Sequence, residues 1–180
     1  MIEDIELSIV RIYKLRENKN DEIIIVGAGF LVSEEYIITC AHVVNQSIGE
    51  NVTSTKKPTE IIECDFPRIA SGTSLETTVE VWHPVKFKSN YPQDIAILRL
   101  KYSVPSQAQP VSLITSEIGD LSDHNYKAYG FSRNEGVWSD GKIIGHIANN
   151  KIQIEDNKST GYAVEGGFSG TAIWDEQLGG

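Results

Sequence analysis

Glu165-Gly166-Gly167-Phe168-Ser169-Gly170 is the stretch that says most about the fold of this chain. A serine flanked by glycines fits a nucleophile on a tight turn, where backbone N–H groups point at a developing oxyanion. Alone, the pattern is weak evidence, because glycine and serine also form ordinary turns. It gains meaning from two upstream stretches, Ile38-Thr39-Cys40-Ala41-His42-Val43-Val44 and Gln93-Asp94-Ile95-Ala96-Ile97-Leu98-Arg99-Leu100.

The three stretches place His42, Asp94 and Ser169 in that order along the chain. In this order and in these hydrophobic contexts they resemble the chymotrypsin/trypsin-like serine peptidases, whose catalytic triad runs His, Asp, Ser. The similarity covers nearly the whole chain. G-A-G-F-L-V at 27–32 resembles the family's strand before the histidine, and G-F-S-G-T-A-I-W at 167–174 stands where the family usually has G-x-S-G-G-P-L.

The resemblance implies a role for each of these residues. His42 suits a general base because an imidazole titrates close to neutrality, and Asp94 would hold its ring in the right tautomer. Ser169 would be the nucleophile, since a hydroxyl attacks only when a nearby base takes its proton. The N–H groups of Gly167 and Ser169 match the family's oxyanion-hole donors. The plain alternatives are a core histidine, a strand-capping aspartate and a turn serine.

Short β-branched or alternating runs, separated by turn signals, predict an all-β protein. Their number and spacing indicate a sandwich or a barrel. Asp140-Gly141 has the sequence of a turn, and Ala41–Gln46 that of a single helical turn after a strand. The expected strands are Leu7–Tyr13, Ile23–Val32, Tyr36–Cys40, Glu60–Phe66, Thr77–Trp82, Asp94–Lys101, Asn125–Phe131, Lys142–Ala148, Lys151–Glu155 and Gly170–Trp174.

The family resemblance implies a definite architecture, a two-lobed chymotrypsin-like double β-barrel with the active site between the lobes. Residues 1–105 would form the first lobe and residues 106–180 the second, joined near Ser103–Pro110. After the nucleophile the family continues with two further strands that this sequence lacks, so the second barrel is expected to keep an open edge. The chain is therefore expected to be a fragment or processed piece of a longer protein, which would carry further domains such as NTPase or repeat domains. Alternatively, another chain would supply the missing strands.

Two further departures from the family concern activation and specificity. Phe168 replaces the aspartate that secreted members carry before the nucleophile, and phenylalanine cannot pair with a newly cleaved N-terminal amine. Activation by N-terminal cleavage is therefore not expected. The floor of the specificity pocket falls on Ala163, with Val164 and Glu165 beside it. An alanine carries no charge, so we expect a preference for uncharged or apolar residues at the cleavage site.

The composition sets outer bounds on the function. The chain has 180 residues, of which 40% are hydrophobic, enough to bury a core in one domain or two small lobes. A net charge of −9 disfavours nucleic acid and anionic membranes as partners. No apolar run reaches the length of a membrane span, and the acidic start is unlike a signal peptide. With only Cys40 and Cys64, free thiols and a cytoplasmic location are favoured over one disulfide.

Together these observations predict a serine endopeptidase that hydrolyses peptide bonds through an acyl-enzyme, with no metal or organic cofactor. Two alternatives stay open from the sequence. The fold would serve as an inert peptide-binding or scaffold module if the incomplete second lobe left the site unformed. An esterase would use the same three residues on a different substrate.

Overall fold

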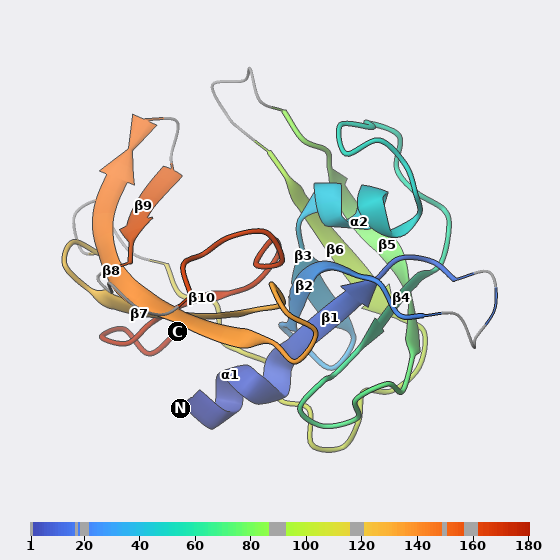
Figure 1. Cartoon of the computed structure of the whole chain (residues 1–180), viewed down its shortest axis with the longest axis horizontal. Helices are drawn as coiled ribbons and strands as arrows, with labels where there is room; N and C mark the ends of the chain where they lie inside the picture. Colours follow the sequence, from blue (N-terminus) through green and yellow to red (C-terminus); the bar gives the residue numbers. More distant parts are fainter. Residues whose placement is uncertain are drawn as a thin grey trace.

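The computed structural model describes residues 2–16, 18, 22–86, 93–115, 121–148, 151–156 and 162–180. Six antiparallel strands form a closed barrel in the order β1-β2-β3-β6-β5-β4, and four more form a separate sheet in the order β10-β7-β8-β9 (Figure 1). The barrel strands are β1 (Ile9–Tyr13), β2 (Ile25–Leu31), β3 (Tyr36–Thr39), β4 (Ile62–Asp65), β5 (Leu75–His83) and β6 (Ile95–Leu100). The second sheet contains β7 (Asn125–Gly130), β8 (Val137–Ile147), β9 (Lys151–Glu155) and β10 (Ile173–Asp175).

Two short helices accompany the barrel. α1 (Ile2–Ser8) leads directly into β1, and α2 (Ala41–Ser47) follows β3. Neither these helices nor any other within the described segments has the length and apolar character needed to cross a membrane. The all-β, two-lobed class expected from the sequence is thus what the chain adopts.

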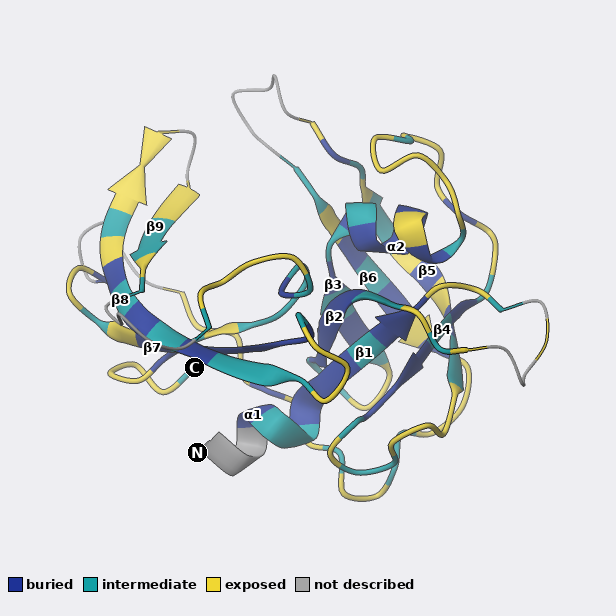
Figure 2. Cartoon of the chain, in the orientation of Figure 1, coloured by how far each residue is buried: buried dark blue, intermediate teal, exposed yellow. Residues whose placement is uncertain are grey.

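The core of the barrel is built by alternating side chains, as expected for strands with one buried face. In β6, for example, Ala96, Leu98 and Leu100 point inward, whereas Ile95 and Arg99 are exposed. Figure 2 shows the same buried band running through the barrel strands. Each fully buried Leu or Ile contributes roughly 1.5–3 kcal/mol. The barrel is therefore a hydrophobic scaffold on which the segments after β3 and before β6 are fixed.

A second apolar cluster joins the two lobes. Ile5, Ile9 and Ala28 from the N-terminal half pack with Tyr129 and Phe131, which lie at the end of β7 and just after it. The two rings meet edge to face with centroids 5.6 Å apart, a favourable aromatic geometry. This contact fixes the second sheet beside β1 and β2.

The second sheet is open, as the sequence predicts. β9 pairs only with β8, and β10 only with β7, within the part of the chain that the structure describes. Between these two edges lies an apolar pocket of about 390 Å³. Its lining includes Phe30, Leu113, Ile143, Ile154, Ile173 and Trp174.

Three secondary-structure predictions were wrong. The strand expected to start at Gly170 starts at Ile173, because Gly170 lies in a turn with φ of +86°. Residues 7 and 8 belong to α1 rather than to the first strand, because this segment packs the buried Ile5 beneath the second sheet. Asp140-Gly141 is not a turn but lies inside β8, where Gly141 is paired with Tyr126. A Cβ on Gly141 would overlap the backbone carbonyl of Glu155. The glycine therefore permits a close approach of two strand backbones.

Candidate active site

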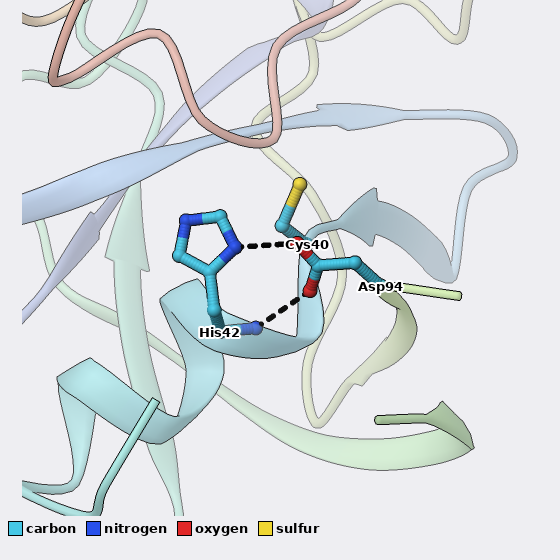
Figure 3. Close-up of side chains that lie close together, drawn as sticks. All are labelled: Cys40, His42 and Asp94. Carbon is cyan, nitrogen blue, oxygen red and sulfur yellow. Dashed lines mark hydrogen bonds and ion pairs between the residues drawn. The ribbon is translucent and has the colours of Figure 1, made fainter. Parts of the chain in front are cut away.

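His42 and Asp94 form a two-point contact on the first lobe (Figure 3). The Nδ1 atom of His42 lies 2.6 Å from Oδ2 of Asp94, and the His42 backbone N–H donates to Oδ1 over 2.9 Å. Because an ionised carboxylate only accepts hydrogen bonds, the ring proton belongs on Nδ1. Nε2 of the neutral ring is then left as an acceptor. The side chains of His42 and Asp94 are 25% and 33% exposed, so solvent and substrate can reach them.

The pairing of β3 with β6 explains why residues so far apart in sequence meet. Thr39 is opposite Ala96 in the antiparallel register, so the segment just after β3 lies opposite the segment just before β6. Cys40 is the N-cap residue of α2 in extended conformation, and the helix starts at the next residue. The buried side chains of Val43 and Val44 hold α2 against the barrel core. The helix therefore presents His42 to Asp94.

The electrostatics of the pair favour a charged imidazole beside a charged carboxylate. The hydrogen bond to Asp94, followed by the contact with the Cys40 thiol, raises the pKa of His42, while burial acts against this. Burial works to raise the pKa of Asp94, but the hydrogen bonds from the His42 ring and backbone outweigh it, and the pKa is lowered. Asp94 thus stabilises the imidazolium that forms when His42 accepts a proton.

Ser169 lies in the segment that approaches the first barrel from the second lobe. Its carbonyl oxygen accepts a hydrogen bond from the Ala28 N–H in β2 over 2.8 Å. A Cβ on Gly27 would come within 3 Å of both the Val43 side chain and this carbonyl oxygen. Gly27 therefore leaves room for the Ser169 segment close to the residue that follows His42. Within the described residues, no hydrogen bond joins the Ser169 hydroxyl to His42; such bonds are often long in ligand-free enzymes.

The backbone around Ser169 is that of a tight turn with two left-handed glycines. Gly167 has φ of +98° and Gly170 has φ of +86°. The Gly167 carbonyl accepts the Phe131 N–H over 2.9 Å, which fixes the peptide that follows it. Among the hydrogen bonds of the described residues, none uses the N–H of Gly167 or of Ser169. Within the described part of the chain, the two donors expected for an oxyanion hole therefore have no protein acceptor.

Phe168 and the three expected pocket residues lie in very different surroundings. Phe168 is only 3% exposed and belongs to the core of the second sheet. Ala163, Val164 and Glu165 are all exposed, and none of them lines the apolar pocket. The specificity pocket assigned from the sequence stays a prediction.

Cys40 belongs to the same neighbourhood, although sequence reasoning gave it no role. Ligand atoms of Cys40, His42 and Asp94 all lie within 4.8 Å of one another. The proximity of Cys40 to His42 could have been suspected from the T-C-A-H stretch. The triad prediction already places Asp94 beside His42, but that the Cys40 sulfur also lies close to Asp94 follows only from the pairing of β3 with β6.

Comparisons with known proteins identify the family and the fold of the chain. The family model described as the trypsin-like peptidase domain matches residues 27–179. No curated protein sequence gives a significant match.

Solved structures share the fold at low sequence identity. A serine endoprotease from Yersinia pestis aligns with a TM-score of 0.61 and 18% identity over 97% of this chain and 52% of its own. The chain thus spans about half the length of that protein. Deg5 aligns with a TM-score of 0.59 and 19% identity, covering 97% of this chain and 77% of its own. An inactive serine-to-alanine mutant of Rv3671c from M. tuberculosis H37Rv aligns with a TM-score of 0.56 and 19% identity, covering 95% of this chain and 73% of its own.

Proposed function

Because the chain belongs to the trypsin-like peptidase family, we propose that it is a serine endopeptidase with His42, Asp94 and Ser169 as its catalytic triad. The observation that carries the proposal is the two-point contact between His42 and Asp94. In the neutral ring that contact leaves Nε2 of His42 as the proton acceptor that a serine nucleophile requires, and the raised pKa of His42 makes that nitrogen a stronger base.

The proposed reaction proceeds by acyl transfer. Nε2 of His42 takes the Ser169 hydroxyl proton while the serine oxygen attacks the peptide carbonyl carbon. Asp94 stabilises the resulting imidazolium, and the N–H groups of Gly167 and Ser169 bind the negative oxygen of the tetrahedral intermediate. His42 then gives its proton to the leaving amine. Water hydrolyses the acyl-enzyme by the same steps with its own proton passing through His42.

The specificity proposed for this site is modest. Ala163, Val164 and Glu165 would border the side chain next to the cleaved bond, and the uncharged Ala163 favours an apolar residue there. A polypeptide is the proposed substrate class. A cytoplasmic location is proposed on the two cysteines, both of which are free.

Intact-mass spectrometry after exposure to a fluorophosphonate tests the triad directly. A single adduct on the wild-type chain, absent from Ser169→Ala, is the expected result. Turnover of a peptide substrate should fall by about 10⁶ in that variant, as for the nucleophile of a comparable triad. An adduct that persists in Ser169→Ala would contradict the assignment of the nucleophile. No adduct on the wild type would favour an inert scaffold, a reading that the open second sheet also supports.

A further inference from the structure

Three side chains of different chemistry converge at the start of α2. Cys40 directly follows β3, His42 lies in the first turn of the helix, and Asp94 directly precedes β6 (Figure 3). A sulfur, an imidazole nitrogen and a carboxylate oxygen all lie within 4.8 Å of one another. The proposed reaction uses the histidine and the aspartate but gives the thiol nothing to do.

We infer that Cys40, His42 and Asp94 form a binding site for a thiophilic divalent cation of the zinc class, and that its occupation switches the peptidase off. Thiolate, imidazole and carboxylate are the three ligand types that zinc prefers in proteins. Three protein ligands leave the fourth tetrahedral position to a water molecule. The regulatory half of this inference rests on the proposed function, whereas the binding half does not.

The distances require only small movements. Tetrahedral zinc, with sulfur at about 2.3 Å and nitrogen or oxygen at about 2.0–2.2 Å, separates its ligand atoms by about 3.4–3.6 Å. The widest pair in the cluster, at no more than 4.8 Å, must close by at most about 1 Å. The Nδ1 to Oδ2 contact of 2.6 Å must open by nearly as much. Both changes are expected from rotations of the Cys40 and Asp94 side chains.

The surroundings of the three residues suit reversible binding of a cation. Oδ1 of Asp94 is held by the His42 backbone N–H, so the carboxylate is oriented by an outer hydrogen bond as metal-binding carboxylates usually are. His42 and Asp94 are each partly exposed, and Cys40 is of intermediate exposure, so an ion reaches the site from solvent. Thiolate and carboxylate together carry two negative charges, which a divalent cation neutralises.

Binding at Nδ1 explains why the cation would inhibit. The Cys40 thiol loses its proton to solvent when the sulfur binds the metal. The imidazolium that the pair favours releases its Nδ1 proton to solvent when Nδ1 binds the metal, and Nε2 keeps its own proton. With Nε2 protonated and Asp94 bound to the metal, the ring cannot accept the proton of Ser169. The same three atoms therefore cannot serve the metal and the peptidase at once.

Titration with cobalt(II), followed by competition with zinc, tests the binding half. A cobalt–thiolate charge-transfer band should appear on the wild-type chain and disappear when zinc is added. Cys40→Ala and the closer-shaped Cys40→Ser should lose the band. Their zinc affinity, measured against a chromophoric chelator, should fall by at least about 10–100-fold, which even outer-sphere partners can cost. Cys64→Ala is the matched control, because Cys64 is buried in the barrel core and the chain has only these two cysteines.

Two further measurements separate this inference from the proposed function. Ser169→Ala should bind cobalt as the wild type does, because the serine is not a ligand. Zinc should slow fluorophosphonate labelling of Cys64→Ala but have at least 10-fold less effect on Cys40→Ser, each compared with its own metal-free rate. The inference is overturned if the cobalt–thiolate band survives in folded Cys40→Ser. It is also overturned if zinc has no effect on fluorophosphonate labelling of a chain that reacts. Neither outcome contradicts the proposed peptidase activity. If the chain binds cobalt through Cys40 but is never labelled by the fluorophosphonate, the metal site stands and the proposed peptidase activity is refuted.

Discussion

The backbone N–H of Ala28 in β2 donates a hydrogen bond to the carbonyl oxygen of Ser169 over 2.8 Å. This bond ties the proposed nucleophile, which belongs to the second lobe, to a strand of the first barrel. Ala28 itself is fully buried, as is the neighbouring Thr39, whose hydroxyl donates to the Ala28 carbonyl over 2.6 Å. The distance between the lobes at the candidate site is therefore set by buried backbone.

Substitution of Gly170 should break this attachment. Gly170 has φ of +86°, and a Cβ there would overlap the Ala28 carbonyl and the Thr39 hydroxyl. For Gly170→Ala we expect a loss of about 1–2 kcal/mol from the left-handed φ alone, with a further loss from the overlap. Urea unfolding measures the stability, and the rate of fluorophosphonate labelling measures the site. Both should fall.

Gly166→Ala is the matched control for that prediction. Gly166 is exposed, has no left-handed φ, and a Cβ there would meet nothing within 4 Å. Its stability and labelling rate should stay close to the wild type. If Gly170→Ala also behaves like the wild type, the close contact of the serine segment with β2 is not needed for the site.

Phe168 is predicted to be a core residue rather than an activation switch. Its ring lies on Gly130, where a Cβ would overlap the ring, and packs with Tyr126, Ala128 and Ile143. Phe168→Ala should lower the free energy of unfolding by about 3–5 kcal/mol. Phe168→Asp should lower it further, because it buries a charge with no partner. Val164→Ala, at an exposed position four residues earlier, should change it little; equal losses in both would contradict the burial.

The fold could be predicted well from local sequence, and the reasons are physical. The inward positions of β6, Ala96, Leu98 and Leu100, alternate in the sequence as they do in the barrel. Gly167 and Gly170 indicate a left-handed backbone conformation, which few other residues tolerate.

What the sequence could not show depends on tertiary contacts. α1 has too few residues for a helical periodicity to emerge, and only its packing beneath Tyr129 and Phe131 explains it. The sequence predicts that Cys40 ends a strand. The position of its sulfur close to Asp94 depends on the register between β3 and β6. The sequence shows that Phe168 differs from the family's usual aspartate. Its burial against Gly130 could not be predicted, because it depends on the position of β7.

Asp65 is expected to be a large single contributor to stability among the charged residues that the structure describes. It is fully buried and accepts two hydrogen bonds from Arg11, at 2.9 and 2.6 Å, and one from the Gly72 N–H at 2.6 Å. The same guanidinium also donates to the carbonyl of Asn134 in the second lobe over 3.0 Å. Asp65→Asn should destabilise the chain by about 3–5 kcal/mol, because Arg11 would keep its charge without a counterion.

Glu35→Gln tests whether burial causes that loss. Glu35 pairs with Arg99 at 3.3 Å, and both side chains are more than half exposed. Water screens such pairs, so the free energy of unfolding should change much less than for Asp65→Asn. Chemical denaturation at one pH and salt concentration compares the two variants. Comparable losses would mean that the ion pairs act through net charge rather than through burial.

Asp175 should make the stability of the second sheet depend on pH in the acid range. Its Oδ2 accepts from Nδ1 of His124 at 2.7 Å, and its Oδ1 accepts from the N–H groups of Gln177 and Leu178 at 2.8 and 3.0 Å. Burial opposes ionisation, but these bonds outweigh it, and the pKa of Asp175 is lowered. A carboxylate with a lowered pKa stabilises the fold above its unfolded pKa of about 3.9, and this contribution disappears as the pH falls through the folded value.

Asp175→Asn should therefore lose about 1–3 kcal/mol at neutral pH, since the amide keeps one acceptor oxygen but cannot serve all three donors. Below about pH 4 the wild type and the variant should converge, because the wild-type carboxyl is then losing its charge. Urea unfolding between pH 7 and pH 3 measures both the loss at neutral pH and the convergence in acid. Glu50→Gln, which changes an exposed carboxylate on the barrel side, should follow the wild-type curve. A constant gap between Asp175→Asn and wild type across this range would show that shape, not ionisation, makes Asp175 important.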